Sequence, residues 1–163
     1  MNDVTIAAWT TESMAEVIQL ILSIQQQEFH ISITADDQPD LQHVDTFYQQ
    51  RKGNFWIAMH QAEVVGTIAL LDIGNRQVAL RKMFVRKDFR GRSKGLAKDL
   101  LATAIHWCIE KNIQDIYLGT VEVLKAAHRF YEKNDFVRIE KQQLPPAFPV
   151  MGVDTIFYHR SIQ

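Results

Sequence analysis

The residues best suited to chemistry form a basic, glycine-punctuated turn over residues 79–98. Eight of the chain's 18 Lys and Arg residues lie between Arg81 and Lys98, against one acid, Asp88, so this window carries +7 in a chain whose net charge is −1. A strand-like run precedes the turn and an amphipathic helical pattern follows it. Free backbone N–H groups and the positive end of the helix dipole meet where a helix begins, and phosphate is the usual anion there. The turn therefore predicts an anion site; the alternative is a solvated loop with incidental charge.

Length and composition fit a single domain over residues 1–163 that buries most of its apolar surface. The basic residues form one short patch and not a stripe, which argues against general nucleic-acid binding. No stretch approaches the roughly 18 apolar residues that a membrane span needs. The N-terminus has neither the basic leader nor the apolar run of a signal peptide. We therefore expect a cytoplasmic protein with no nucleic-acid or membrane partner.

Cysteine and histidine limit the chemistry further. The single cysteine, Cys108, lies on the apolar side of a predicted helix, so we expect a buried core residue in a reducing compartment. His30, His43, His60 and His106 have no ligand-like spacing with cysteines or acids. No metal site is expected.

The apolar patterns predict the elements that must position the basic turn. Strands are expected at residues 4–8, 55–59, 63–71, 77–85, 115–119, 136–139 and 155–160. Helices are expected from a cap at Thr11 or Ser13 to about residue 27, and at 41–50, 96–111 and 124–134. This order predicts an α/β fold with a mixed sheet and helices on both of its faces.

Two motifs in this framework resemble signatures of the GCN5-related N-acetyltransferases (GNAT). Residues 92–97 (Arg-Ser-Lys-Gly-Leu-Ala) fit the pattern Gln/Arg-x-x-Gly-x-Gly/Ala, which in that family follows a hydrophobic strand and opens a helix. Residues 130–136 (Phe-Tyr-Glu-Lys-Asn-Asp-Phe) resemble the second signature, a tyrosine followed by a basic residue and a Gly-Phe pair. The order, spacing and context of both motifs agree with the family. The resemblance implies the acyl-CoA N-acyltransferase fold, with a central, mostly antiparallel mixed sheet.

The resemblance implies acetyl-CoA as the co-substrate and assigns most of the turn to binding it. The pantetheine arm is expected along the end of the 77–85 strand, with the strand ending at Gly119 and Thr120 splaying away. Side chains must not crowd the pyrophosphate, which suits Gly95 and the small Ala97. Arg90, Arg92, Lys94 and Lys98 are expected to neutralise the phosphates. The expected cofactor-binding residues are Met83, Phe84, Val85, Arg90, Gly91, Arg92, Ser93, Lys94, Gly95, Leu96, Ala97 and Lys98.

Tyr131 matches the tyrosine that serves the family as general acid. An amine that attacks the thioester releases coenzyme A as a thiolate, and a phenol with a pKa of about 10 stays protonated at neutral pH and can donate to that sulfur. The alternative for Tyr131 is a core residue with its hydroxyl at the surface. Glu28 is the first candidate for the base, Asp72 the second and Asp37 the third; the alternative for each is an ordinary surface acid.

Three departures from the family pattern affect these expectations. The stretch between Val85 and Gly95 is about two residues longer than the commonest spacing, so the pyrophosphate loop is expected to start earlier. Asp135 replaces the usual glycine, so Asn134 or Asp135 must adopt the left-handed conformation. The asparagine common near the start of the 124–134 helix is absent.

Three functions remain open from the sequence. The first is an N-acetyltransferase acting by direct attack of a primary amine, with a small-molecule or peptide acceptor. The acidic remainder of the chain favours a cationic amine, and dimers are common among GNAT relatives, so the resemblance allows a homodimer. The second is a non-catalytic acyl-CoA-binding or interaction domain. The third, a nucleotide-binding α/β domain, lacks the Gly-Lys-Ser/Thr ending of a phosphate-binding loop.

Overall fold

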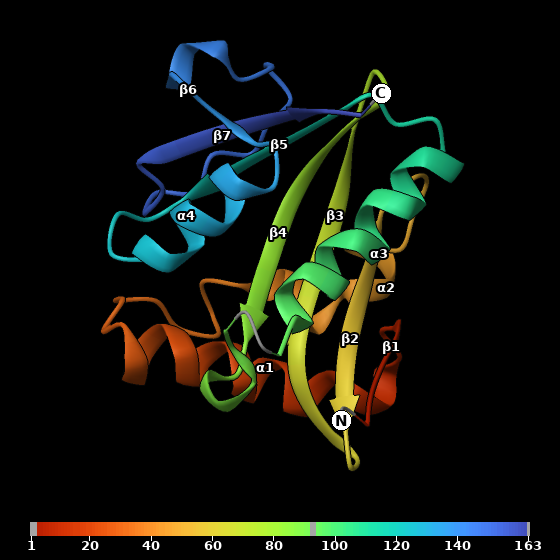
Figure 1. The fold of residues 1–163 in the computed structure, drawn as a ribbon, viewed down its shortest axis with the longest axis vertical. Coiled ribbons are helices and arrows are strands. Elements are labelled where there is room, and N and C mark those ends of the chain that lie inside the picture. The colour runs from red at the N-terminus through yellow and green to blue at the C-terminus, as the bar shows by residue number, and fades with distance from the viewer. Residues whose placement is uncertain (1–2, 92–93, 163) are drawn as a thin grey trace.

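The computed structural model describes residues 3–91 and 94–162, and its core is one seven-stranded sheet (Figure 1). The strands are β1 (Val4–Ala8), β2 (Asn54–His60), β3 (Glu63–Gly74), β4 (Gln77–Val85), β5 (Asp115–Thr120), β6 (Val137–Ile139) and β7 (Ile156–Ser161). The α-helices are α1 (Met14–Leu22), α2 (Val44–Phe47), α3 (Leu96–Glu110) and α4 (Lys125–Lys133). The strand order is β1-β2-β3-β4-β5-β7-β6, and all neighbours are antiparallel except β4 and β5. The predicted mixed, mostly antiparallel sheet is confirmed.

Helices cover both faces of the sheet because its strands carry apolar side chains on both sides. On one face, Leu100 of α3 and Tyr131 of α4 pack with Leu80 of β4 in the larger core cluster. On the other face, Ile21 of α1 packs with Phe55 of β2. The central strand β4 contributes to both clusters, since Leu80 belongs to the first and Phe84 packs against the second.

The parallel pair β4 and β5 separates along its length. The two strands pair only over Gln77–Asp115, Val78–Ile116 and Ala79–Tyr117, and then both continue without pairing to each other. Figure 1 shows them diverging from that end, with α4 beside the opening. The remaining six residues of β4, from 80 to 85, keep β3 on one side, and within the described ranges no strand pairs with them on the other side. The expected splay beyond Ala79 is confirmed, and it leaves backbone N–H and C=O groups of β4 facing the opening.

A β-bulge interrupts the part of β4 that β5 leaves unpaired. The β3–β4 register shifts between Thr67 and Ala69, and Lys82 has a φ of 55°. The Thr67 hydroxyl donates a hydrogen bond of 2.7 Å to the Lys82 carbonyl, which satisfies one backbone group that the bulge frees. Because side chains alternate in a regular strand, the bulge turns Lys82 toward the face that Arg81 already occupies.

Two predicted helices differ from the structure. The helix expected at 41–50 is a 3-10 turn over Pro39–Gln42 followed by the single-turn α2, because His43 leaves helical geometry with φ −138° and ψ 42°. The helix expected to reach residue 27 changes after Leu22 into a π-helical segment, Ser23–Glu28. By contrast, the left-handed residue expected at 134 or 135 is Asp135, with φ 72°. Within the described ranges, no helix combines the length and the apolar character needed to cross a membrane.

Candidate active site

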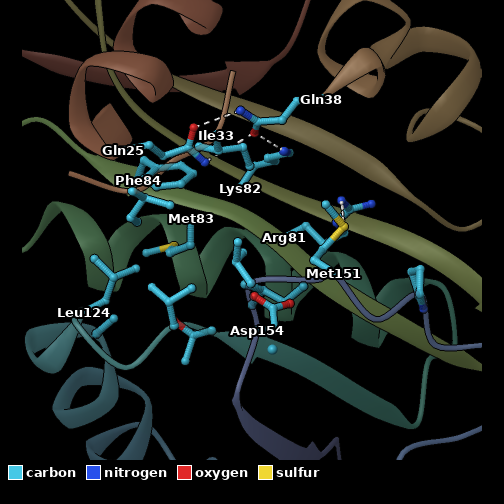
Figure 2. Close-up of a pocket in the computed structure, with 18 of the residues that line it drawn as sticks. Gln25, Ile33, Gln38, Arg81, Lys82, Met83, Phe84, Leu124, Met151 and Asp154 are labelled. Carbon is cyan, nitrogen blue, oxygen red and sulfur yellow. Dashed lines mark hydrogen bonds between the residues drawn. The ribbon is translucent and has the colours of Figure 1, made fainter. Parts of the chain in front are cut away.

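A cavity of about 130 Å³ lies in the opening between β4 and β5 (Figure 2). Residues of β4 form one wall, and the end of β5, the start of α4 and the segment before β7 form the other. The lining includes Gln25, Gln38, Arg81, Lys82, Met83, Phe84, Gly119, Tyr131, Phe148 and Asp154. The walls are mostly apolar, with a few polar groups that converge, as is usual for a small-molecule site.

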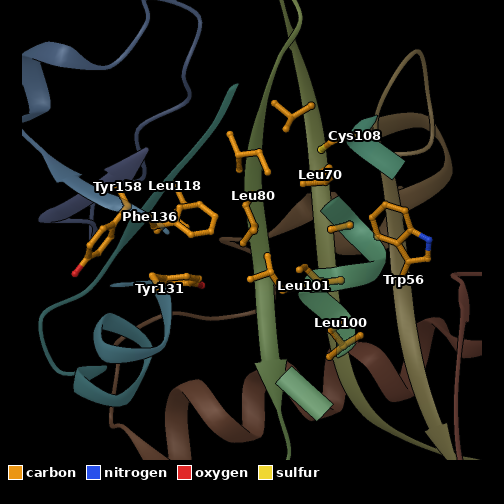
Figure 3. Packing of buried hydrophobic residues seen from close by; sticks show 14 of the residues in the cluster. Trp56, Leu70, Leu80, Leu100, Leu101, Cys108, Leu118, Tyr131, Phe136 and Tyr158 are labelled. Carbon is orange, nitrogen blue, oxygen red and sulfur yellow. The ribbon is translucent and has the colours of Figure 1, made fainter. Parts of the chain in front are cut away.

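Tyr131 presents its hydroxyl to this cavity while its ring is held in the core. The side chain is 5% exposed, and its ring centroid lies 5.4 Å from that of Phe136 and 5.8 Å from that of Tyr158 (Figure 3). Among the described residues, none hydrogen-bonds to the Tyr131 hydroxyl. Burial, assisted by the nearby charge of Asp154, raises the pKa of Tyr131 above its usual value. The hydroxyl therefore stays protonated at neutral pH and is free to donate to a guest.

Asp154 is the acid that the structure brings to the cavity. It lies between the proline-bearing loop and β7, and its backbone N–H donates to the Met151 carbonyl at 3.1 Å. The carboxylate lies over Gly119 of β5, where a Cβ atom would come within 2.7 Å of Oδ2. Burial raises the pKa of Asp154 to about 6, against the opposing attraction of Arg81 and Lys82. A carboxylate with such a pKa is ionised at neutral pH and is a stronger base than a solvated aspartate.

Lys82 is tied into a buried polar network beneath the cavity. Its ammonium group donates to Gln38 Oε1 at 2.6 Å and lies 3.5 Å from Asp40 Oδ2. The Tyr48 hydroxyl also donates to that carboxylate, at 2.6 Å, and Gln38 is held in turn by Gln25 at 2.9 Å. Burial lowers the pKa of Lys82 to about 8, against the opposing effect of Asp40. The network fixes the segment around Gln38–Tyr48 against the bulge of β4.

The start of α3 is built to accept an anion. Gly95 is the N-cap of this 15-residue helix and has the left-handed conformation, with φ 69°. No side chain at the N-cap accepts a hydrogen bond from the first N–H groups of the helix. A Cβ atom at Gly95 would meet no atom within 4 Å, so the approach is open. The buried side chain of Leu96 fixes the first residue of α3 against the core. The side chains of Lys94 and Lys98 on either side of it are exposed. The edge of β4 that β5 leaves open and this helix start are the two places where the sequence resemblance expects the pantetheine and pyrophosphate parts of acetyl-CoA.

Arg90 and Glu28 are brought together, and neither lines the cavity. Arg90 donates from both terminal nitrogens to the Glu28 carboxylate, with Nη2 at 2.7 Å from Oε1, and its Nε donates to the Val85 carbonyl at 2.7 Å. The hydrogen bonds from Arg90 hold the pKa of Glu28 below its usual value. This pair anchors the beginning of the turn to the helix that ends at Glu28. The turn itself starts with a 3-10 turn, Lys87–Phe89.

The remaining predicted residues divide between the site and the scaffold. The strand residues Met83 and Phe84 line the cavity, and Val85 is buried at the end of β4. Arg92 and Ser93 lie outside the described residues, next to the exposed Gly91. Over the described ranges, no group of three His, Cys, Asp or Glu side chains is arranged to hold a metal ion.

Cys108 and His128 take structural roles. Cys108 is buried in the core, and burial raises the pKa of its thiol to about 12. A thiol in that environment is a poor nucleophile. The His128 ring nitrogen Nε2 lies 2.9 Å from the Val121 carbonyl oxygen, so this side chain fastens α4 to the end of β5.

Sequence reasoning missed Arg81, Lys82 and Asp154 as members of the site. Arg81 and Lys82 were counted only as part of the basic turn, although two charges inside an apolar strand were the available signal. Asp154 had no comparable signal because it follows a loop of irregular sequence and reaches the cavity only through the pairing of β7 with β5.

Comparisons with known proteins identify the family of this chain. The model of the acetyltransferase (GNAT) family matches residues 18–136. A GNAT-family acetyltransferase from Staphylococcus aureus Mu50 is 40% identical with a TM-score of 0.95, covering 98% of this chain and 99% of that one. N-acetylaspartate synthetase from Danio rerio is 36% identical over 102 residues, which are 61% of this chain and 36% of that protein. The chain thus spans about a third to a half of the curated relatives that it matches first.

One of the fold neighbours was solved with coenzyme A bound. The PaiA N-acetyltransferase of Thermoplasma acidophilum, solved in complex with coenzyme A, has a TM-score of 0.75 at 15% identity and covers 98% of this chain and 99% of its own. At that identity the likeness concerns the fold alone. Because the family model matches residues 18–136 and the Staphylococcus aureus acetyltransferase is 40% identical over nearly its whole length, the chain belongs to the GNAT family of acetyltransferases.

Proposed function

We propose that this chain catalyses acetyl-CoA-dependent N-acetylation of a small-molecule or peptide amine. The observation that carries the proposal is that a protonated tyrosine, Tyr131, and a buried carboxylate, Asp154, line one cavity in the opening between β4 and β5. Acetyl-CoA, when bound, supplies the acetyl group as a thioester. Curated relatives of this chain include proteins named N-acetylaspartate synthetase, and the product in that name contains an N-acetyl bond of the kind proposed here.

Each side chain has one role in the proposed transfer. The acceptor nitrogen forms a bond to the acetyl carbon while the carbon–sulfur bond breaks. Asp154 accepts the proton that the nitrogen must lose, and the Tyr131 hydroxyl donates its proton to the departing sulfur, after which water reprotonates the phenolate. Coenzyme A leaves as a thiol. Because Cys108 is buried with a raised pKa, the transfer is proposed to be direct, without an acetylated enzyme.

The cofactor-binding residues are proposed from the same geometry. The backbone of Met83, Phe84 and Val85 lies on the edge of β4 that β5 leaves open and would hydrogen-bond the pantetheine arm. The N–H groups at the start of α3 would hold the pyrophosphate, with Lys94 and Lys98 at the rim. Arg90 would shape the turn through Glu28 and not meet the phosphates directly.

Calorimetric titration with acetyl-CoA tests this assignment. We expect the native protein to bind and Gly95→Glu to weaken binding by about tenfold or more, because the substitution adds a negative charge and a strained left-handed side chain at the helix start. Gly74→Glu is the matched control: Gly74 also has a positive φ, of 87°, and open space around it, but lies in the β3–β4 turn. Absence of binding to the native protein would contradict the proposal.

A further inference from the structure

The guanidinium group of Arg81 lies in the cavity, and no described residue forms a salt bridge with it. Its Nη2 donates to the Met151 sulfur at 3.3 Å (Figure 2). Its guanidinium carbon lies 5.7 Å and 5.9 Å from the ring centroids of Phe47 and Tyr48. A thioether is a weak acceptor, and an arginine has five N–H donors. Among the described residues, no carboxylate lies within 4 Å of the guanidinium, whereas Arg86 has two carboxylate partners and Arg90 has one.

The other charged residues that line the cavity, Lys82 and Asp154, do not form a salt bridge with Arg81 either. Lys82 is turned by the bulge to the same face as Arg81, but Asp40 and Gln38 already bind its ammonium group. Asp154 attracts Arg81 across the cavity without forming a salt bridge to it. The guanidinium lies beside two aromatic rings, and among the described residues only the Met151 sulfur accepts a hydrogen bond from it, so N–H donors remain free. Two N–H groups of a guanidinium can donate to the two oxygens of one carboxylate.

We propose that Arg81 binds a carboxylate group of the acceptor, so that the preferred substrates are amines that also carry a carboxylate, such as amino acids. This inference rests on the proposed function. The cavity then offers a cation for the carboxylate and, in Asp154, a carboxylate for the amino group, which together complement a zwitterion. The overall acidity of the chain outside the basic turn favoured a cationic acceptor, but the charges that line the cavity itself point to this class.

Matched acceptors test the inference. Initial rates of coenzyme A release are measured with the L-amino acids and with their α-carboxamides, and L-aspartate and L-glutamate are compared with L-asparagine and L-glutamine. We expect the best acceptors to carry a carboxylate, and loss of one particular carboxylate to lower kcat/KM on the order of 10²-fold, because the guanidinium is left unpaired. Arg81→Gln should remove most of this preference, and Arg81→Lys should restore part of it. The affinity for acetyl-CoA should stay unchanged in both variants.

Arg138→Gln, at an exposed position of β6, is the control that removes an arginine away from the cavity. Equal rates with acids and amides, or an equal loss of both in Arg81→Gln, would overturn the carboxylate assignment while leaving acetyl transfer in place. Transfer only to amines without a carboxylate would do the same. Transfer to no amine at all would overturn the proposed function and this inference with it.

Discussion

Replacing Tyr131 with phenylalanine is expected to lower kcat on the order of 10²-fold or more with little change in the affinity for acetyl-CoA. The ring packs against Phe136 and Tyr158, and phenylalanine keeps this packing. Only the hydroxyl is lost, and no described residue depends on it for a hydrogen bond. Steady-state kinetics, with calorimetry for acetyl-CoA binding, measures the two quantities separately.

Tyr158→Phe is the matched control. Tyr158 is buried beside Tyr131, but its hydroxyl donates to Glu132 at 2.7 Å and is not part of the cavity lining. Loss of the Tyr158 hydroxyl should leave kcat within about twofold of the native value, because its hydrogen bond to Glu132 contributes only to stability. If Tyr131→Phe kept the native kcat, the role of Tyr131 as general acid would be refuted.

Replacing Asp154 with asparagine is expected to lower kcat/KM at neutral pH on the order of 10²-fold, because the amide keeps the shape but cannot accept the proton. The same carboxylate sets the acid side of the pH profile. Its pKa is raised by burial to about 6, and only the ionised form is a base, so kcat/KM of the native enzyme should rise with pH through about 6. The profile is measured as kcat/KM from pH 5 to pH 8.

Glu28→Gln separates the two candidate bases. Glu28 is held by Arg90 outside the cavity lining, and its lowered pKa makes it a weaker base. We expect its loss to shift acetyl-CoA binding more than kcat. A large fall in kcat for Glu28→Gln, with a native rate for Asp154→Asn, would return the base role to Glu28.

The sequence predicted the fold well where periodicity and packing agree. All seven strands and the long α3 follow apolar patterns that one layer of helices on each face can bury. The helix expected at 41–50 was predicted too long, since local propensity carried no sign of the break at His43. The Lys82 network, which joins residues far apart in the chain, holds that segment in its short form.

The site was predictable only where a motif marks it. Tyr131 and Gly95 belong to sequence patterns tied to a strand, a helix start and a helix end, so their positions followed from the pattern. Asp154 and Arg81 meet through strand pairing and a β-bulge, which depend on contacts between distant segments. Those contacts are set by tertiary packing, and a single sequence does not record them.

Direct acetyl transfer at this site is tested most directly by a reaction that contains acetyl-CoA with ¹³C in its acetyl carbonyl and a mixture of amino acids and simple amines. Nuclear magnetic resonance follows the labelled carbon, and mass spectrometry of the intact protein detects any acetyl group on the enzyme. We predict that label appears as an N-acetyl amide in step with coenzyme A release, and that the protein keeps its unmodified mass. Bound acetyl-CoA that yields no amide, or an acetylated enzyme that precedes the product, would contradict direct transfer by this site.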